Sequence, residues 1–270
     1  MNVKVIAVDM DGTFLNDEKT YDRERFMTQY QQLRERDIHF VVASGNQYYQ
    51  LISFFPEIAS EISFVAENGA LVYDHGEQVH HGALRPEDTA KIARVLASFG
   101  DINYVTCGLQ SAWYQQGASD EFIALMEKHY HRLQPIDDVT QINDIIFKYS
   151  LNLDDQQIPA LIHQLNHALD GIIHPVTSGY GFVDLIIPGS HKASGLRRLL
   201  NRWHIDAADL VCVGDSANDL EMLHLAGYSF AMANASSAVK TTAQYSTASN
   251  NESGALDVID AVLRGDTPFN

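Results

Sequence analysis

The sequence has little cysteine and no long apolar run, and each absence excludes a class of protein. No segment approaches the roughly 20 consecutive apolar residues that a membrane-spanning helix needs. The two cysteines, Cys107 and Cys212, are too few for a disulfide framework, and we expect both to be free thiols in a reducing compartment. The chain opens without the charged and then apolar segments of a secretory signal. We therefore expect a cytoplasmic protein with no membrane partner.

Basic residues are scarce as well. Lysine and arginine total 18 against 35 aspartate and glutamate residues, which gives a formal net charge of -17. Such a surface repels the phosphate backbone of nucleic acids, so we expect no nucleic-acid partner. A phosphorylated small molecule can still bind where a metal ion and one lysine create a local positive charge. The sequence also lacks a Walker loop, and this absence argues against nucleotide-dependent phosphoryl transfer.

What the sequence does contain, at its start, is a buried strand that ends in two acids. Residues 3–8 are mostly apolar and β-branched, a pattern typical of a strand covered on both faces of a sheet. Asp9 and Asp11 follow directly, and Gly12 allows the backbone to turn away.

Other candidate side chains follow strands further along the chain. A buried strand over residues 38–43 precedes Ser44 and Gly45, and another over 210–213 precedes Asp215. Because the carboxyl ends of parallel strands meet at one edge of a sheet, we expect these residues to lie beside the two acids.

Two predicted helices begin with polar residues that could bind the same ligand. Lys192 falls in the first turn of a helix over 190–203, where a cation is favourable if the lysine and the helix terminus bind one phosphate. Asn218 and Asp219 begin the helix that follows Asp215, where short polar side chains also often cap the backbone.

The paired carboxylates favour phosphoryl chemistry. Asp9 and Asp11 repel each other unless a cation lies between them, and Mg²⁺ prefers oxygen ligands. A carboxylate can also attack phosphorus as a nucleophile. We therefore predict that one of the two carboxylates binds Mg²⁺ and attacks a phosphate ester, while the other protonates the leaving oxygen and later activates water. Asp215 is the natural third ligand of the metal.

The middle of the chain reads as a separate α+β segment. Helix and strand patterns alternate between about residues 84 and 178, and this stretch holds none of the candidate site residues. An insert of this length is large enough to fold as a domain. We expect a core domain of residues 1–83 and 184–270, with a cap domain of residues 84–183 inserted into it.

The candidate residues belong to four motifs that occur in a known order. These are DMDGT at residues 9–13, Ser44 in VVASGN, Lys192 in PGSHKASG and GDSAND at residues 214–219. With ENGA at 67–70 and LIIP at 185–188, this set resembles the haloacid dehalogenase superfamily, in particular the sugar phosphatases of its Cof-type branch. The resemblance implies an α/β fold: a Rossmann-like parallel sheet with helices on both faces, and an inserted C2-type α+β cap that closes over the site.

The resemblance also implies a role for each residue. Asp9 and Asp11 would be catalytic, and Mg²⁺ would be held by Asp9, the main-chain carbonyl of Asp11, and Asp215. The remaining roles are phosphate binding by Ser44, Gly45, Lys192 and Asn218, and support of the metal or of Lys192 by Asp219.

These observations predict a Mg²⁺-dependent phosphatase that hydrolyses small phosphorylated metabolites, above all sugar phosphates, through a phosphoaspartate on Asp9. A phosphotransferase or phosphomutase would use the same intermediate, and the motifs do not separate these fates. A non-catalytic phosphosugar sensor is the alternative of another class, although a sensor has no need of Asp11. Dehalogenation is disfavoured, because in the resembling family that chemistry does without the second aspartate and the metal.

Overall fold

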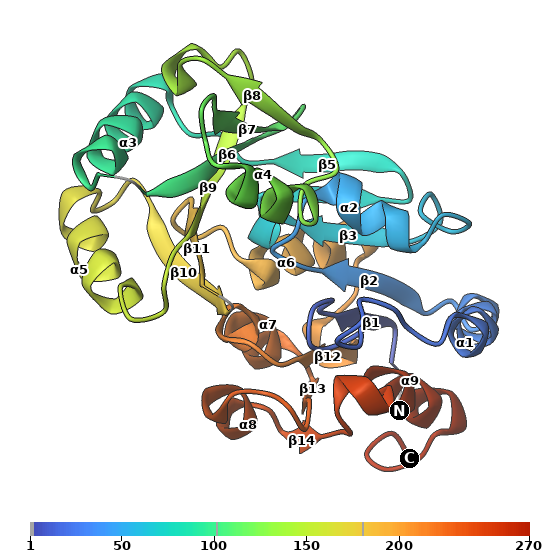
Figure 1. The fold of residues 1–270 in the computed structure, drawn as a ribbon. Helices are drawn as coiled ribbons and strands as arrows, with labels where there is room; N and C mark the ends of the chain where they lie inside the picture. The colour runs from blue at the N-terminus through green and yellow to red at the C-terminus, as the bar shows by residue number, and fades with distance from the viewer. Residues whose placement is uncertain (1–2, 101, 180) are drawn as a thin grey trace.

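The computed structural model describes residues 3–100, 102–179 and 181–270, which contain two β-sheets (Figure 1). The larger sheet has eight strands, of which the six from β14 to β3 are parallel and the last two are antiparallel. Its order is β14 (Tyr245–Ser246), β13 (Tyr228–Ala231), β12 (Leu210–Gly214), β1 (Val5–Val8), β2 (His39–Ala43), β3 (Ser63–Ala66), β4 (Leu71–Asp74) and β5 (Glu77–His81).

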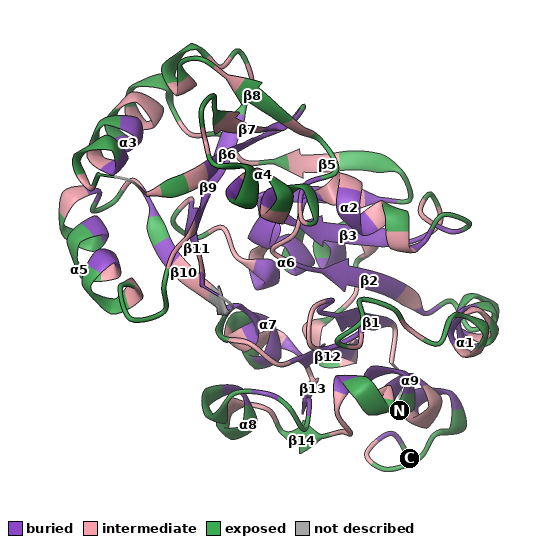
Figure 2. Cartoon of the chain, in the orientation of Figure 1, coloured by how far each residue is buried: buried purple, intermediate pink, exposed green. Residues whose placement is uncertain are grey.

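The central strands of this sheet are buried because helices cover both of its faces. Every residue of β1 and β12 is buried, as Figure 2 shows for the centre of the molecule. Helices α1 (Arg23–Glu35) and α9 (Gly254–Arg264) pack together on one side of these strands, whereas α6 (Lys192–Trp203) and α7 (Leu220–Leu225) pack together on the other (Figure 1). The predicted Rossmann-like α/β core is confirmed.

The smaller sheet has six strands and its own helices. Its order is β10 (His174–Gly179), β11 (Phe182–Ile186), β9 (Ile146–Asn152), β6 (Asn103–Gly108), β7 (Ala112–Gln115) and β8 (Leu133–Ile136). Helices α3 (Pro86–Ser98) and α5 (Ile158–Ala168) share one apolar cluster with Leu151 and Leu185, while α4 (Asp120–Glu127) shares a second with Phe147. This is the predicted α+β cap, and it lies beside the carboxyl ends of β1 and β2 (Figure 1).

One predicted boundary falls inside a strand. The division between residues 183 and 184 would split β11, although residues 182–186 pair with β9 on one side and β10 on the other. The apolar pattern of this strand fits either sheet, so the sequence could not show which one it joins. We propose that the cap domain ends at Ile186.

Two of the sequence-based exclusions can be compared with the structure. In the three described ranges no helix is long and apolar enough to cross a membrane. Cys107 and Cys212 are both buried and form no disulfide, as expected.

Candidate active site

Asp9 follows directly after the last residue of β1 and is buried at the carboxyl end of the central strands of the larger sheet. Its amide donates a hydrogen bond of 3.1 Å to the carbonyl oxygen of Val213 on β12. Its carboxylate oxygen Oδ1 lies 2.5 Å from the Nζ of Lys192, the first residue of α6. Lys192 is fully buried, and its Nζ also lies 2.6 Å from Oδ1 of Asp219. Lys192 thus contacts Asp9, which is 183 positions away in the sequence, and Asp219, which is 27 positions away.

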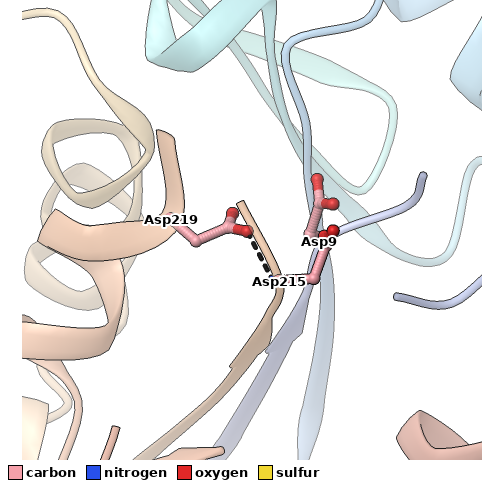
Figure 3. Close-up of side chains that lie close together, drawn as sticks. All are labelled: Asp9, Asp215 and Asp219. Atoms are coloured by element: carbon pink, nitrogen blue, oxygen red, sulfur yellow. Dashed lines mark hydrogen bonds between the residues drawn. The ribbon is translucent and has the colours of Figure 1, made fainter. Parts of the chain in front are cut away.

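Asp215 and Asp219 complete a cluster of three carboxylates (Figure 3). Each of Asp9, Asp215 and Asp219 offers an oxygen within 4.8 Å of the others. Asp219 accepts hydrogen bonds of 2.9 Å from the amides of Asp215 and Ser216, so its position is fixed by the turn after β12. Asp215 accepts hydrogen bonds of 3.0 Å from the hydroxyls of Thr13 and Ser216.

The cluster carries more negative charge than its lysine can balance. Burial raises the pKa of Asp9 well above its ordinary range, with Lys192 opposing the shift and the other two carboxylates adding to it. Burial, and next the charge of Asp219, raise the pKa of Asp215 to about 6. A divalent cation would offset this repulsion.

The cluster fits Mg²⁺ by its chemistry and by its backbone. Its donors are all carboxylate oxygens, which suit this hard cation. Gly12 has φ +75°, and a Cβ there would lie 2.7 Å from Oδ2 of Asp215, so only glycine lets the loop approach the carboxylate this closely. Asp9 and Asp215 would hold the metal, and Asp219 lies near enough to take part.

Asp11 lines the site but lies apart from this cluster. Its carboxylate accepts hydrogen bonds from Nζ of Lys19 at 2.5 Å and from Nδ2 of Asn46 at 2.6 Å. Its side chain therefore lines the cavity without joining the carboxylate cluster. That its main-chain carbonyl binds the metal stays a prediction.

Of the four predicted phosphate-binding residues, Ser44, Gly45 and Asn218 line the cavity, and Lys192 contacts Asp9, which also lines it. Ser44 is buried directly after β2, and its hydroxyl oxygen accepts a 3.1 Å hydrogen bond from the amide of Asn46. A Cβ on Gly45 would lie 3.1 Å from Nδ2 of Asn68. Asn218 is buried and donates from Nδ2 to Oδ1 of Asn68 at 3.1 Å. All of the predicted site residues therefore converge at one edge of the sheet.

The cavity has a volume of about 480 Å³ and is bounded by both sheets. The core side contributes Asp9, Asp11, Gly12, Asn16, Asp17, Lys19, Ser44, Gly45, Asn46, Ser216 and Asn218. The cap side contributes Leu125, His129, Tyr130, Lys148, Ser150, Phe182 and Asp184. A ligand bound to the core would thus contact aromatic, apolar and charged groups of the cap.

Sequence reasoning assigned no role to several of these residues. Lys19 and Asn46 hold Asp11, and nothing in their spacing signals this contact. Lys148 was detectable in principle, because it is a lone charge in the strand β9, whose sequence is IFKYSLN. Asn68 lies in one of the motifs of the family resemblance, but its contacts depend on strands far apart in the sequence.

Comparison with known proteins identifies the family. The model of the haloacid dehalogenase-like hydrolases matches residues 6–259. The chain belongs to this family. The resemblance inferred from the four motifs is thereby confirmed.

Relatives of this hydrolase are similar over its full length. It is 51% identical to the 5-amino-6-(5-phospho-D-ribitylamino)uracil phosphatase YbjI of Escherichia coli K12, over 100% of this chain and 99% of the relative. It is 28% identical to a phosphoglycolate phosphatase of Natronomonas pharaonis, over 96% and 97%. The crystal structure of SMU.1108c from Streptococcus mutans UA159 is 36% identical, with a TM-score of 0.93 over 97% of this chain and 99% of that chain.

The raised pKa of Asp215 predicts a pH-dependent stability of the metal-free hydrolase. Below pH 3.8, the ordinary pKa of an aspartate, the carboxyl of Asp215 is protonated in both the folded and the unfolded state and does not lower stability. As the pH rises through about 6, the folded protein must carry the negative charge of Asp215, so the free energy of unfolding falls. Asp215→Asn should therefore raise the free energy of unfolding at pH 7.5 by up to about 3 kcal/mol and change it little at pH 4. Urea unfolding in chelator at several pH values measures this difference.

Asp155→Asn is the matched control, because Asp155 is exposed and does not line the cavity. Its effect should not vary with pH in this window. A difference between the Asp215 variant and the parent that stays constant from pH 4 to 7.5 would contradict the assignment.

Proposed function

We propose that this hydrolase is a Mg²⁺-dependent phosphatase of small phosphorylated metabolites that works through a phosphoaspartate on Asp9. The observation that carries the proposal is the convergence of Asp9, Lys192, Asp215 and Asp219 in one cluster, of which all but the partly buried Asp215 are buried. Asp11 lines the same cavity as Asp9. A bound Mg²⁺ would lower the charge of the cluster and polarise the phosphate oxygens.

The reaction divides into two displacements at phosphorus. The carboxylate of Asp9 attacks the phosphorus atom, the bond to the ester oxygen breaks, and Asp11 protonates that leaving oxygen. Asp11 then accepts a proton from a water molecule that attacks the phosphoaspartate, which restores Asp9 and releases inorganic phosphate. Lys192, Ser44 and Asn218 stabilise the charge on the phosphoryl oxygens, the kind of stabilisation on which phosphoryl transfer depends.

The size and the lining of the cavity favour a substrate larger than a simple triose phosphate. Asp17 and Ser150 line it and can hydrogen bond to hydroxyl groups, while Tyr130, Phe182 and His129 offer ring faces and edges to an apolar or heterocyclic part. The 51% identical relative is named for a phosphate ester on a ribityl chain that carries a uracil. We propose the same class of substrate here: a phosphate ester of a sugar or sugar alcohol, with room for an attached heterocycle.

A substrate panel with a chelator control tests this proposal. Release of inorganic phosphate is measured with Mg²⁺ from 5-amino-6-(5-phospho-D-ribitylamino)uracil, from hexose and pentose phosphates, and from phosphoglycolate. We expect activity to disappear in excess chelator, to return with Mg²⁺, and to be highest with the sugar-alcohol and sugar esters. No turnover of any ester would favour a binding protein over an enzyme.

A labelled phosphoryl group separates hydrolysis from transfer. When the label on the substrate is followed in the presence of a second sugar, we expect it in inorganic phosphate. Label that accumulates in the added sugar would instead indicate a phosphotransferase or phosphomutase.

A further inference from the structure

Two charged residues of the cap are buried against the core, and the proposed chemistry uses neither of them. Lys148 on β9 is 1% exposed and Asp184 on β11 is 4% exposed. The Nζ of Lys148 lies 2.6 Å from Oε2 of Glu67 and 3.6 Å from Oδ2 of Asp184. It also donates a hydrogen bond of 2.7 Å to the carbonyl oxygen of Gly45. A cap lysine thus contacts the loop that is predicted to bind phosphate.

The second contact of Lys148 is with a strained turn, residues Glu67, Asn68 and Gly69, which we call the ENG segment. All three residues have positive φ angles, of 52°, 54° and 87°, and this conformation is unfavourable for a side chain as large as glutamate. The amides of its first two residues donate to the carbonyl oxygens of Asn46 and Ser44. A Cβ on its glycine would lie 2.3 Å from the carbonyl oxygen of His191, the residue before Lys192. The ENG segment therefore touches two parts of the phosphate site.

Asp184 is linked to Asn218, a second predicted phosphate-binding residue, by hydrogen bonds through Asn68 of the ENG segment. Its Oδ2 accepts a hydrogen bond of 2.7 Å from Nδ2 of Asn68, whose Oδ1 accepts one of 3.1 Å from Nδ2 of Asn218. An ionised carboxylate can only accept, so Asn68 must turn its NH₂ toward Asp184 and its oxygen toward Asn218. The orientation of the Asn218 amide thus depends on a carboxylate of the cap.

We propose that Lys148 and Asp184 are positioning residues that orient Gly45 and Asn218, so that the phosphate site is complete only when the cap makes these contacts with the core. This inference rests on the proposed function, because it takes Gly45 and Asn218 as phosphate ligands. Contacts that served only to hold the two domains together would stabilise the protein without changing its affinity for phosphate.

The test compares turnover and phosphate affinity in Lys148→Met. We expect kcat to fall by roughly 10-fold to 100-fold, the range for displaced positioning groups. The loss should be similar for p-nitrophenyl phosphate and for a larger sugar ester, because the defect lies at the phosphate. The dissociation constant of inorganic phosphate with Mg²⁺, measured by calorimetry, should rise in parallel.

Two further variants keep the test decisive if Lys148→Met folds poorly. Asp184→Ala leaves the ion pair of Lys148 with Glu67 in place, and we expect a smaller loss in the same direction. The double variant Lys148→Met, Glu67→Gln leaves no charge at the former ion pair of Lys148 with Glu67. Its stability should therefore lie between those of Lys148→Met and the parent, whereas its affinity for phosphate should be as low as that of Lys148→Met.

Thr106→Val is the matched control. Thr106 is a buried polar residue of the same cap sheet, opposite Tyr149 in the register of β6 with β9, and it does not line the cavity. This variant should bind phosphate and turn over substrate as the parent does.

Two results would overturn the inference. One is phosphate affinity and kcat within twofold of the parent in both Lys148→Met and Asp184→Ala, with only the melting temperature lowered. The other is a loss confined to the larger ester, which would assign these residues to the leaving group. Because phosphate binding is measured without turnover, a parent protein that binds phosphate but releases none would count against the proposed function alone.

Discussion

Replacement of Asp9 by asparagine is expected to abolish phosphate release, with kcat lower by about 10⁴-fold or more, the scale on which loss of a nucleophile acts. The amide cannot attack phosphorus, and no other carboxylate of the cluster occupies its place at the end of β1. The measurement is the release of inorganic phosphate at saturating substrate and Mg²⁺. In the parent protein, rapid quenching should also trap label on the chain, and this label should be absent from the variant.

The variant should remain folded and should still bind its ligand. Asparagine has nearly the same volume, and Lys192 keeps its ion pair with Asp219. Asp155→Asn is the control, because Asp155 is an exposed aspartate that does not line the cavity; it should retain kcat within about tenfold. If Asp9→Asn turned over at a rate within tenfold of the parent, Asp9 would not be the nucleophile and the phosphoaspartate would have to be abandoned.

The strands of the core were predictable because each is a short apolar run that ends in a polar group. The strands expected over residues 38–43 and 210–213 are observed as β2 at 39–43 and β12 at 210–214. Strand β8 was missed, since its sequence LQPI holds a proline, which is tolerated here because β8 lies at the edge of its sheet. Helix α8 (Ser237–Thr242) and strand β14 are too short for any periodicity to be visible.

The core side of the site could be predicted for a related reason. Asp9, Ser44 and Asp215 each follow a parallel strand, and the geometry of such a sheet brings these positions together. Lys192 and Asp219 open helices at the same edge. The sequence thus predicted which residues meet. The family resemblance implied that Asp219 supports the metal or Lys192, and its carboxylate lies in the cluster and contacts Lys192.

The cap side of the site could not be predicted, because it depends on how two domains are docked. Lys148 and Asp184 lie on the paired strands β9 and β11 of the cap sheet. Their core partners Gly45, Glu67 and Asn68 lie in the segments that follow β2 and β3. No periodicity of the chain encodes that docking. The same limit explains the misplaced boundary at residue 183, since β11 has the apolar pattern of a core strand and joins the cap sheet.

Replacement of Lys192 by methionine is expected to reduce both stability and activity strongly. The lysine is fully buried between Asp9 and Asp219, and methionine would leave two buried carboxylates without their cation. Breaking a buried ion pair from one side costs about 3–5 kcal/mol, so urea unfolding in chelator at pH 7.5 should show a loss of this size. We expect kcat to fall by roughly 10³-fold, since a charge that stabilises the transferring phosphoryl group is lost.

A second substitution separates these two effects. Adding Asp219→Asn to Lys192→Met removes one of the unpaired carboxylates, so part of the lost stability should return, while kcat should stay low because nothing replaces the ammonium beside Asp9. Lys240→Met, at an exposed lysine of α8, should change neither quantity. A Lys192→Met protein as stable as its parent in chelator at pH 7.5 would mean that Asp9 and Asp219 do not depend on this lysine for their countercharge. The cluster would then bear its excess charge in some other way, and the main argument for a divalent cation at this site would be lost.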